Sequence, residues 1–110
     1  MGDTLRLGGY LVSPAEIESH LMEHPQVDSA QVVAVRVGEV MRPYAFLIPP
    51  QSAVPDKEDL LRHCTEGLAR FKVPVAFHCL EAFPTTMSPN GTKIQRAKLR
   101  QLAEATLSDN

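Results

Sequence analysis

The 110-residue sequence contains no apolar run long enough to span a bilayer, and its start lacks the basic and hydrophobic regions of a signal peptide. A basic excess is missing too, since the net charge is −2 at pH 7, and this argues against nucleic acid or an anionic membrane as a partner. No segment repeats. With 44% hydrophobic and 22% charged residues, the composition is that of one ordinary globular domain. We therefore expect a cytoplasmic domain with no membrane span.

Cysteine is scarce, with Cys64 and Cys79 as the only two. Each follows a histidine, His63 or His78, and this pairing raises the question of a zinc site. One pair is expected in a helix and the other in a strand, and neighbouring side chains diverge in both. We therefore predict no metal site and two buried free thiols.

Turn and capping signals divide the chain into short elements. In chain order we expect a hairpin over 5–12 turning at Gly8-Gly9, a helix over 14–23 capped by Ser13, strands over 27–37 and 44–48, a helix capped by Asp56, a strand over 75–80 and a final helix starting at Lys93. The fold class is α+β: an N-terminal β-hairpin, then a small, mainly antiparallel three-stranded sheet packed by about three helices. One face of the hairpin over 27–48 should pack under the helices.

The expected start of the final helix carries a lysine. Thr92 and Gln95 fit a T-x-x-Q capping box, and this makes Lys93 the first helical residue, at the positive end of the helix dipole. A cation there costs about 0.3–1 kcal/mol, so its position suggests that an anion visits it. A solvated loop lysine is the alternative.

Four segments match, in order, the motifs of one enzyme superfamily. Residues 3–18 match D-x-I-K-x-x-G-x-x-V-x-P-x-E-I-E, residues 24–27 match H-P-x-V, and residues 71–74 match an aromatic residue followed by K-x-P. Residues 84–100 match P-x-T-x-x-G-K-I-x-R-x-x-L-R, aligned on Lys93 although Thr92 intervenes after the glycine. The chain thus resembles the C-terminal domain of the adenylate-forming enzymes, which include acyl- and aryl-CoA synthetases, firefly luciferase and nonribosomal peptide adenylation domains.

The resemblance covers nearly the whole chain and implies its domain organisation. The arginine that opens the first family motif is absent, and Gly2 falls at the hinge position with Asp3 next to it. We therefore expect residues 1–110 to form a single C-terminal lid domain that starts at the interdomain hinge. The large N-terminal adenylation domain would be absent, and the isolated chain inactive.

The resemblance also implies an activity: an ATP-dependent, AMP-forming acyl-CoA synthetase. It would adenylate a carboxylic acid and then transfer the acyl group to a thiol, most often that of coenzyme A. The lid would rotate between two poses, one for each half-reaction. ATP with its Mg²⁺, AMP and coenzyme A would be held mainly by the missing domain, and the identity of the acid would also be set there.

Family roles fall on five residues of this sequence. Lys93 would catalyse adenylation by bridging the substrate carboxylate and the phosphate. Gly8, Gly9 and Tyr10 would approach the thiol-bearing arm in the second pose. Lys72 would anchor the lid or meet a coenzyme A phosphate.

Less specific interpretations stay open. Tyr10 could cap the core beside an ordinary tight turn, Lys72 could lie along the core surface, and Arg96 could pair with a surface acid. The alternative functions are a non-catalytic interaction or regulatory module, the lid of an enzyme that loads a carrier protein, and a small standalone phosphate-binding protein.

Overall fold

The computed structural model describes residues 4–50, 55–89 and 91–108. The predicted hinge residues Gly2 and Asp3 lie outside these ranges. In chain order the elements are β1 (Leu5–Leu7), β2 (Tyr10–Val12), α1 (Pro14–Met22), β3 (Ser29–Val37), β4 (Val40–Ile48), α2 (Lys57–Gly67), the 3₁₀ helix η2 (Arg70–Lys72), β5 (Phe77–Cys79), β6 (Thr85–Ser88), β7 (Gly91–Ile94) and α3 (Arg96–Ser108).

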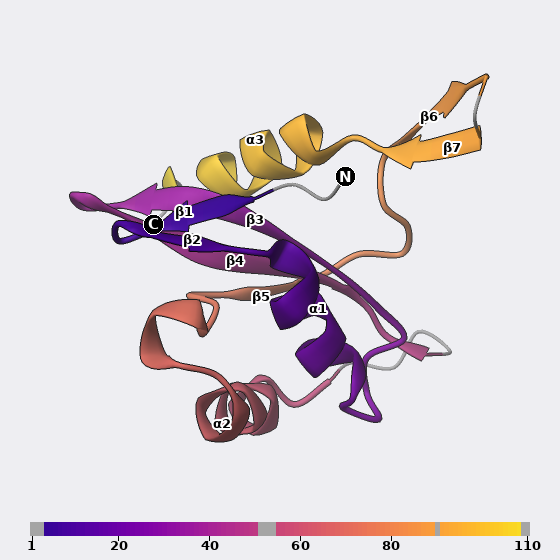
Figure 1. Ribbon diagram of the computed structural model, residues 1–110. Helices are drawn as coiled ribbons and strands as arrows, with labels where there is room; N and C mark the ends of the chain where they lie inside the picture. The colour runs from indigo at the N-terminus through magenta and orange to yellow at the C-terminus, as the bar shows by residue number, and fades with distance from the viewer. Residues whose placement is uncertain (1–3, 51–54, 90, 109–110) are drawn as a thin grey trace.

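A three-stranded sheet of order β3-β4-β5 forms the centre of the fold (Figure 1). Strands β3 and β4 pair antiparallel along their whole length, whereas β5 runs parallel to β4. The parallel pairing follows from the connection, because α2 carries the chain back before β5 begins. The α+β class and the mainly antiparallel sheet are confirmed, with β5 as the parallel exception.

The sheet is buried on both faces, so the expectation of one covered face is wrong. Alternate residues of a strand point to opposite faces, and here Val32 packs in one core cluster while Val33 packs in the other. Helices α1 and α2 cover the first face, and α3 covers the second (Figure 1). The buried side of α3 consists of Leu99 and Ala103. Because both faces of the sheet are covered, β3 and β4 have nearly continuous apolar sequences.

Local capping signals mostly behave as predicted. Asp56 caps α2, since its side chain accepts hydrogen bonds from the backbone N–H groups of Glu58 at 3.0 Å and Asp59 at 3.4 Å. Ser13 occupies the N-cap of α1 and Pro14 follows it as the first helical residue, but the Ser13 side chain makes no capping hydrogen bond. Both helices begin where the sequence predicts.

Two short hairpins lie on different sides of the molecule, and only β6–β7 extends away from its body (Figure 1). The first, β1–β2, turns at Gly8 and Gly9, whose φ angles of 55° and 91° both lie in the region that favours glycine. The second, β6–β7, pairs Thr85 with Ile94 and extends away from the start of α3. The first hairpin was predicted; the second was not.

Candidate functional site

Lys93 lies in strand β7, directly opposite Thr86, and not at the start of a helix. The predicted capping box is therefore wrong. Gln95 donates from its side-chain amide to Thr86 Oγ1 instead of reaching back to Thr92, and its backbone N–H donates to the Pro84 carbonyl at 2.9 Å. These bonds extend the hairpin through the positions where the helix was expected.

Helix α3 begins at Arg96, because the Gln95 carbonyl accepts the backbone N–H groups of Lys98 at 3.1 Å and Leu99 at 3.3 Å. The cation at the positive end of the helix dipole is thus Arg96. Its guanidinium pairs with the buried carboxylate of Glu18 at 3.2 Å. Arg96 thus pairs with an acid, as the sequence suggested, but that acid is buried and not on the surface. The anion that the dipole argument called for belongs to the protein itself.

The Lys93 side chain is exposed on the hairpin. It borders a hollow of about 480 Å³ together with Gln31, Thr92, Ile94 and Arg96. In the part of the chain that the structure describes, no acidic side chain forms an ion pair with Lys93. The ammonium group is therefore available to an external anion.

The turn at Gly8 and Gly9 stands open. Within the described part of the chain, a Cβ atom added to either glycine would meet no atom within 4 Å other than those of its chain neighbours, so the backbone angles are what requires glycine here. The next residue, Tyr10, is 60% exposed and stacks on Phe71, with ring centroids 4.5 Å apart and planes 22° from parallel. The turn and the aromatic-K-x-P segment, which lie far apart in the sequence, thus form one surface.

Lys72 adjoins this surface. Its Nζ lies 2.5 Å from the carboxylate of Glu16 and 5.6 Å from the centroid of the Phe71 ring. An exposed pair of this kind contributes little stability by itself. Its clearest structural effect is to tie η2 to the first turn of α1, close to the stacked rings.

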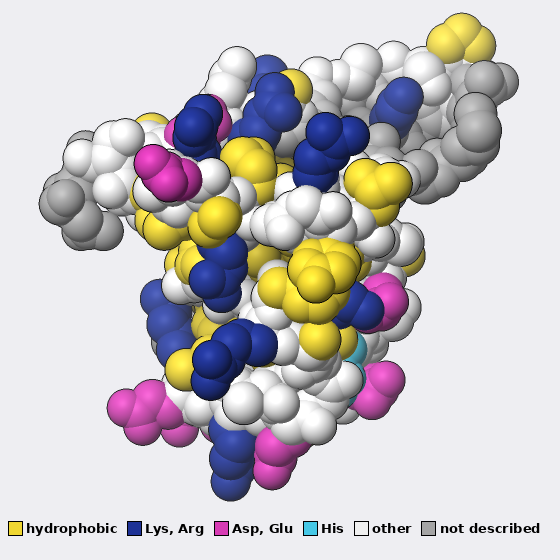
Figure 2. All heavy atoms as spheres, turned by 60° about the vertical axis from the view of Figure 1, so that its left-hand side comes forward, with side chains coloured by type: hydrophobic (Ala, Val, Ile, Leu, Met, Phe, Trp, Pro, Cys, Tyr) yellow, Lys and Arg dark blue, Asp and Glu magenta, His cyan; other side chains and the backbone are white. Residues whose placement is uncertain are grey.

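Sequence reasoning missed two arginines near the same turn. Arg42 and Arg70 line a hollow of about 380 Å³ that also contacts Gly8 and Phe71. Arg70 directly precedes the aromatic-K-x-P motif, so its position could have drawn attention, whereas Arg42 lies inside a strand and gives no such signal. Seen from the side that carries the first hairpin, Lys and Arg side chains surround apolar ones (Figure 2).

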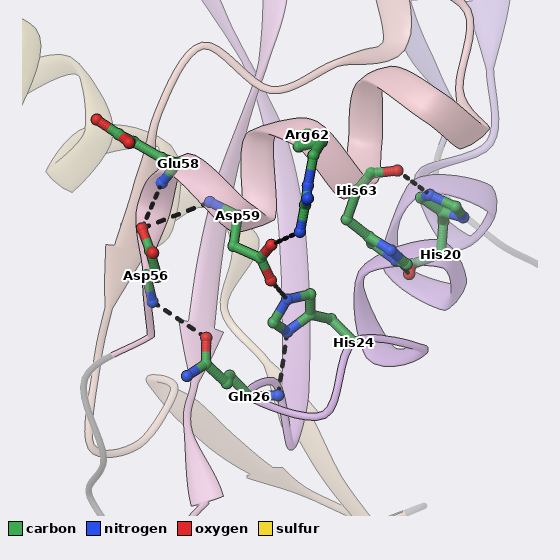
Figure 3. A network of polar contacts seen from close by, with 8 residues as sticks. All are labelled: His20, His24, Gln26, Asp56, Glu58, Asp59, Arg62 and His63. Carbon is green, nitrogen blue, oxygen red and sulfur yellow. Dashed lines mark hydrogen bonds and ion pairs between the residues drawn. The ribbon is translucent and has the colours of Figure 1, made fainter.

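The two His-Cys pairs do not converge. His63 joins His20 and His24 between α1 and α2 (Figure 3). Its ring stacks on that of His20 and meets that of His24 edge-on, and the three rings donate to backbone or carboxylate oxygens. His78 instead accepts or donates a hydrogen bond with the Tyr44 hydroxyl at 3.0 Å on the other side of the sheet. Within the described ranges, no group of three or more metal-binding side chains comes together.

The predicted pair of buried thiols is half right. Cys64 is fully buried, and this burial raises its pKa to about 11. Cys79 is only partly buried, because it lies on the edge strand β5 beside a hollow of about 690 Å³. Burial and the charge of Lys57 lower the pKa of the neighbouring His78.

Comparison with known proteins identifies the family of this chain. The AMP-binding enzyme C-terminal domain family matches residues 16–89. The chain belongs to this family, and the predicted resemblance to the adenylate-forming lid is confirmed. Across residues 4–50, 55–89 and 91–108, none of the helices combines the length and apolar character needed to cross a membrane.

Individual relatives agree with the family. The 2-succinylbenzoate–CoA ligase of Geobacillus kaustophilus is 36% identical over 107 residues, which cover 94% of this chain and 21% of the relative. Among solved structures, the chain resembles the anthranilate CoA ligase AuaEII in complex with anthranoyl-AMP, with a TM-score of 0.81, 35% identity, and coverage of 94% of this chain and 21% of that one.

A second solved structure, o-succinylbenzoate CoA synthetase from Bacillus subtilis with its acyl-adenylate OSB-AMP, gives a TM-score of 0.76 and 30% identity. It covers 89% of this chain and 19% of that one. The chain thus spans about a fifth of the length of the relatives it matches.

Proposed function

We propose that this chain is the mobile C-terminal lid of an ATP-dependent, AMP-forming acyl-CoA synthetase, in which Lys93 catalyses adenylation. Its partners would be an N-terminal adenylation domain and a carboxylic acid substrate, and the protein would work in the cytoplasm. Residues 1–110 would form one domain that begins at the hinge around Gly2 and Asp3. The family match and the similarity to CoA ligases support this proposal.

The observation that carries the proposal is the position of Lys93. Its ammonium group stands on a projecting hairpin, without an acidic partner among the described residues. When a carboxylate attacks the α-phosphate of ATP, two anions must approach each other, and a fixed cation between them stabilises the transition state. A long-stemmed lysine can deliver that charge from a lid into a site on another domain.

The second half-reaction would use the other hairpin. Gly8, Gly9 and Tyr10 would face the thiol-bearing acceptor after the lid rotates, with the Tyr10–Phe71 stack as a flat apolar wall. Lys72 would anchor this wall through Glu16. Arg42 and Arg70, which border the hollow beside Gly8, favour an acceptor with several phosphate charges such as coenzyme A over a carrier-protein arm.

ATP and Mg²⁺ would bind mainly to the N-terminal domain. This chain would add one cation at the moment of adenylation and would bind the nucleotide weakly by itself. A non-catalytic module would need neither the exposed Lys93 nor the open glycine turn, and a standalone phosphate-binding protein would need more donors than one lysine.

The test uses the full-length protein. Anthranilate, 2-succinylbenzoate and a series of straight-chain fatty acids are supplied with ATP and Mg²⁺, and pyrophosphate release identifies the acid. With that acid, Lys93→Ala should slow adenylation by about 10²–10³-fold, the loss typical for one preorganised donor. Thioester formation from the preformed acyl-adenylate and coenzyme A should stay at the wild-type rate.

Because Lys93 is exposed and unpaired with any described acid, its substitution should leave the unfolding temperature unchanged. Lys98→Ala, which removes an exposed lysine from α3, serves as the matched control. Equal loss of both half-reactions in the Lys93 variant, or loss of neither, would contradict the assignment.

A further inference from the structure

Glu18 is a charged residue in an unusual position. It is 7% exposed, although carboxylates are seldom buried without partners. Its Oε2 atom accepts the backbone N–H of Val32 at 2.8 Å and the Nη1 group of Arg96 at 3.2 Å. The same Nη1 group donates to the Val32 carbonyl at 3.0 Å. Three segments that are distant in the sequence therefore meet at one point.

The meeting point is the free edge of the central sheet. Among the described residues, strand β3 pairs with β4 on one side and with no strand on the other. Val32 lies opposite Ala45 of β4, whose N–H donates away from β3 to the carbonyl of Ala76, the residue before β5, at 3.1 Å. Val32 therefore turns both its N–H and its carbonyl outward. Glu18 and Arg96 satisfy this pair of groups as the backbone of a neighbouring strand would.

Arg96 also stands at the root of the Lys93 hairpin. It directly follows Gln95, whose backbone N–H closes the hairpin onto Pro84. Arg96 and Lys93 border the same hollow of about 480 Å³. The direction in which the hairpin leaves the body of the domain is thus set where Arg96 is held.

We propose that the Glu18–Arg96 pair is a positioning device for adenylation, which fixes the Lys93 hairpin against α1 and the edge of β3. The proposal rests on the function assigned to Lys93 above. Glu18 does not touch the reacting atoms; it acts through Arg96. Its carboxylate also offsets the cost of a guanidinium at the positive end of the α3 dipole, and this keeps the first turn of α3 and the end of β7 in place.

The test compares Glu18→Gln and Arg96→Gln in the full-length protein with Lys93→Ala. The amide oxygen of the Glu18→Gln variant can still accept the Val32 N–H, so this variant removes the charge and leaves the strand edge satisfied. Glu104→Gln, an exposed acid on α3, is the matched control. Adenylation, thioester formation from preformed acyl-adenylate, and amide hydrogen exchange over Gly91–Ile94 are measured for each.

Displacement of a catalytic group by about 1 Å can cost 10²-fold in rate, so we expect each single variant to slow adenylation by about 10–100-fold. Thioester formation should keep its wild-type rate, and exchange over Gly91–Ile94 should speed up. The Glu18→Gln/Arg96→Gln double variant should be no slower than either single one, because both remove the same contact.

Equal slowing of both half-reactions would show a merely structural role and overturn the inference. Full adenylation by Glu18→Gln, with Lys93→Ala inactive, would overturn the inference and leave the proposed function intact. Full adenylation by Lys93→Ala would overturn the proposed function and, with it, the positioning role. If Glu18→Gln does not fold, Arg96→Lys decides, since it keeps the charge near Glu18 but cannot reproduce the guanidinium geometry. It should then adenylate at a reduced rate while forming thioester normally; a wild-type adenylation rate would overturn the inference.

Discussion

The open turn at Gly9 allows a pair of substitutions in which the loss of folding stability can be separated from obstruction of an incoming ligand. Gly9 has a φ of 91°, so any other residue pays a backbone penalty of about 1–2 kcal/mol. Apart from its two chain neighbours, no atom of the residues that the structure describes lies within 4 Å of a Cβ added to Gly9. Gly9→Ala and Gly9→Leu should therefore be destabilised to the same extent. Against a typical stability of about 5–15 kcal/mol, both variants stay folded.

Any difference in rate between the two variants must come from something that approaches the turn from outside. If the thiol-bearing acceptor passes this turn, the leucine obstructs it and the alanine obstructs it less. Thioester formation by the full-length protein should then fall about 10-fold or more from Gly9→Ala to Gly9→Leu, in line with the sensitivity of catalysis to small displacements. Adenylation should be the same in both, because the turn then faces away from the site.

Gly91 provides the reciprocal control. It has a φ of 118° and lies in the hairpin that carries Lys93. An added Cβ there also meets no described residue within 4 Å other than a chain neighbour. Gly91→Leu should slow adenylation and spare thioester formation. The two half-reactions are followed by pyrophosphate release and by consumption of preformed acyl-adenylate. Identical thioester rates for Gly9→Ala and Gly9→Leu would refute the proposed approach of the acceptor.

Two further predictions concern titratable groups away from the hairpins. The hydrogen bond from His24 is the main cause that holds the pKa of Asp59 below its ordinary value of 3.8. An acid with a lowered folded-state pKa stabilises the fold above the unfolded value and loses that contribution as pH falls through the folded value. Asp59→Asn should thus be less stable than wild type at pH 7. Urea denaturation at decreasing pH should show that the difference in free energy of unfolding between the two proteins narrows below pH 3.8. A difference that stays constant with pH would contradict this. With a pKa of about 11, the buried Cys64 thiol is deprotonated in roughly one molecule in a thousand at pH 8. Iodoacetamide should therefore label the partly buried Cys79 first, and peptide mapping can check this. Equal labelling of the two cysteines would contradict the assigned burial.

The elements that the sequence predicts well are those governed by local rules. The Gly8-Gly9 turn needs two adjacent residues with positive φ, and the Asp56 cap needs one side chain and the next two or three N–H groups. The two features that the family motifs single out, Lys93 and the glycine turn, are both exposed in the structure. These signals are complete within a few residues, and at these positions the tertiary structure keeps the local conformation.

The elements that the sequence predicts poorly depend on distant partners. Residues 92–95 satisfy the helix-capping pattern, yet pairing with residues 85–88 places 92–94 in a strand. Strand β6 has no buried apolar residue from which the sequence could indicate this pairing. The burial of Glu18 is similar. Its partner Arg96 is 78 positions away. Helical spacing from Pro14 and Leu21 places Glu18 on the buried side of α1, but nothing in this spacing identifies the partner of its carboxylate.

The separation of the two candidate surfaces bears on the mechanism. The β6–β7 hairpin, which carries Lys93, and the β1–β2 hairpin, which turns at Gly8 and Gly9, lie on different sides of a body that measures 38 × 31 × 30 Å (Figure 1), and the two sites border separate hollows. Both cannot face one active site at the same time. If each serves one half-reaction, the domain must reorient between them, and each hairpin must keep its own direction relative to the common body. The Glu18–Arg96 pair gives the Lys93 hairpin such a fixed root, and the Tyr10–Phe71 stack together with the Lys72–Glu16 pair gives one to the glycine turn.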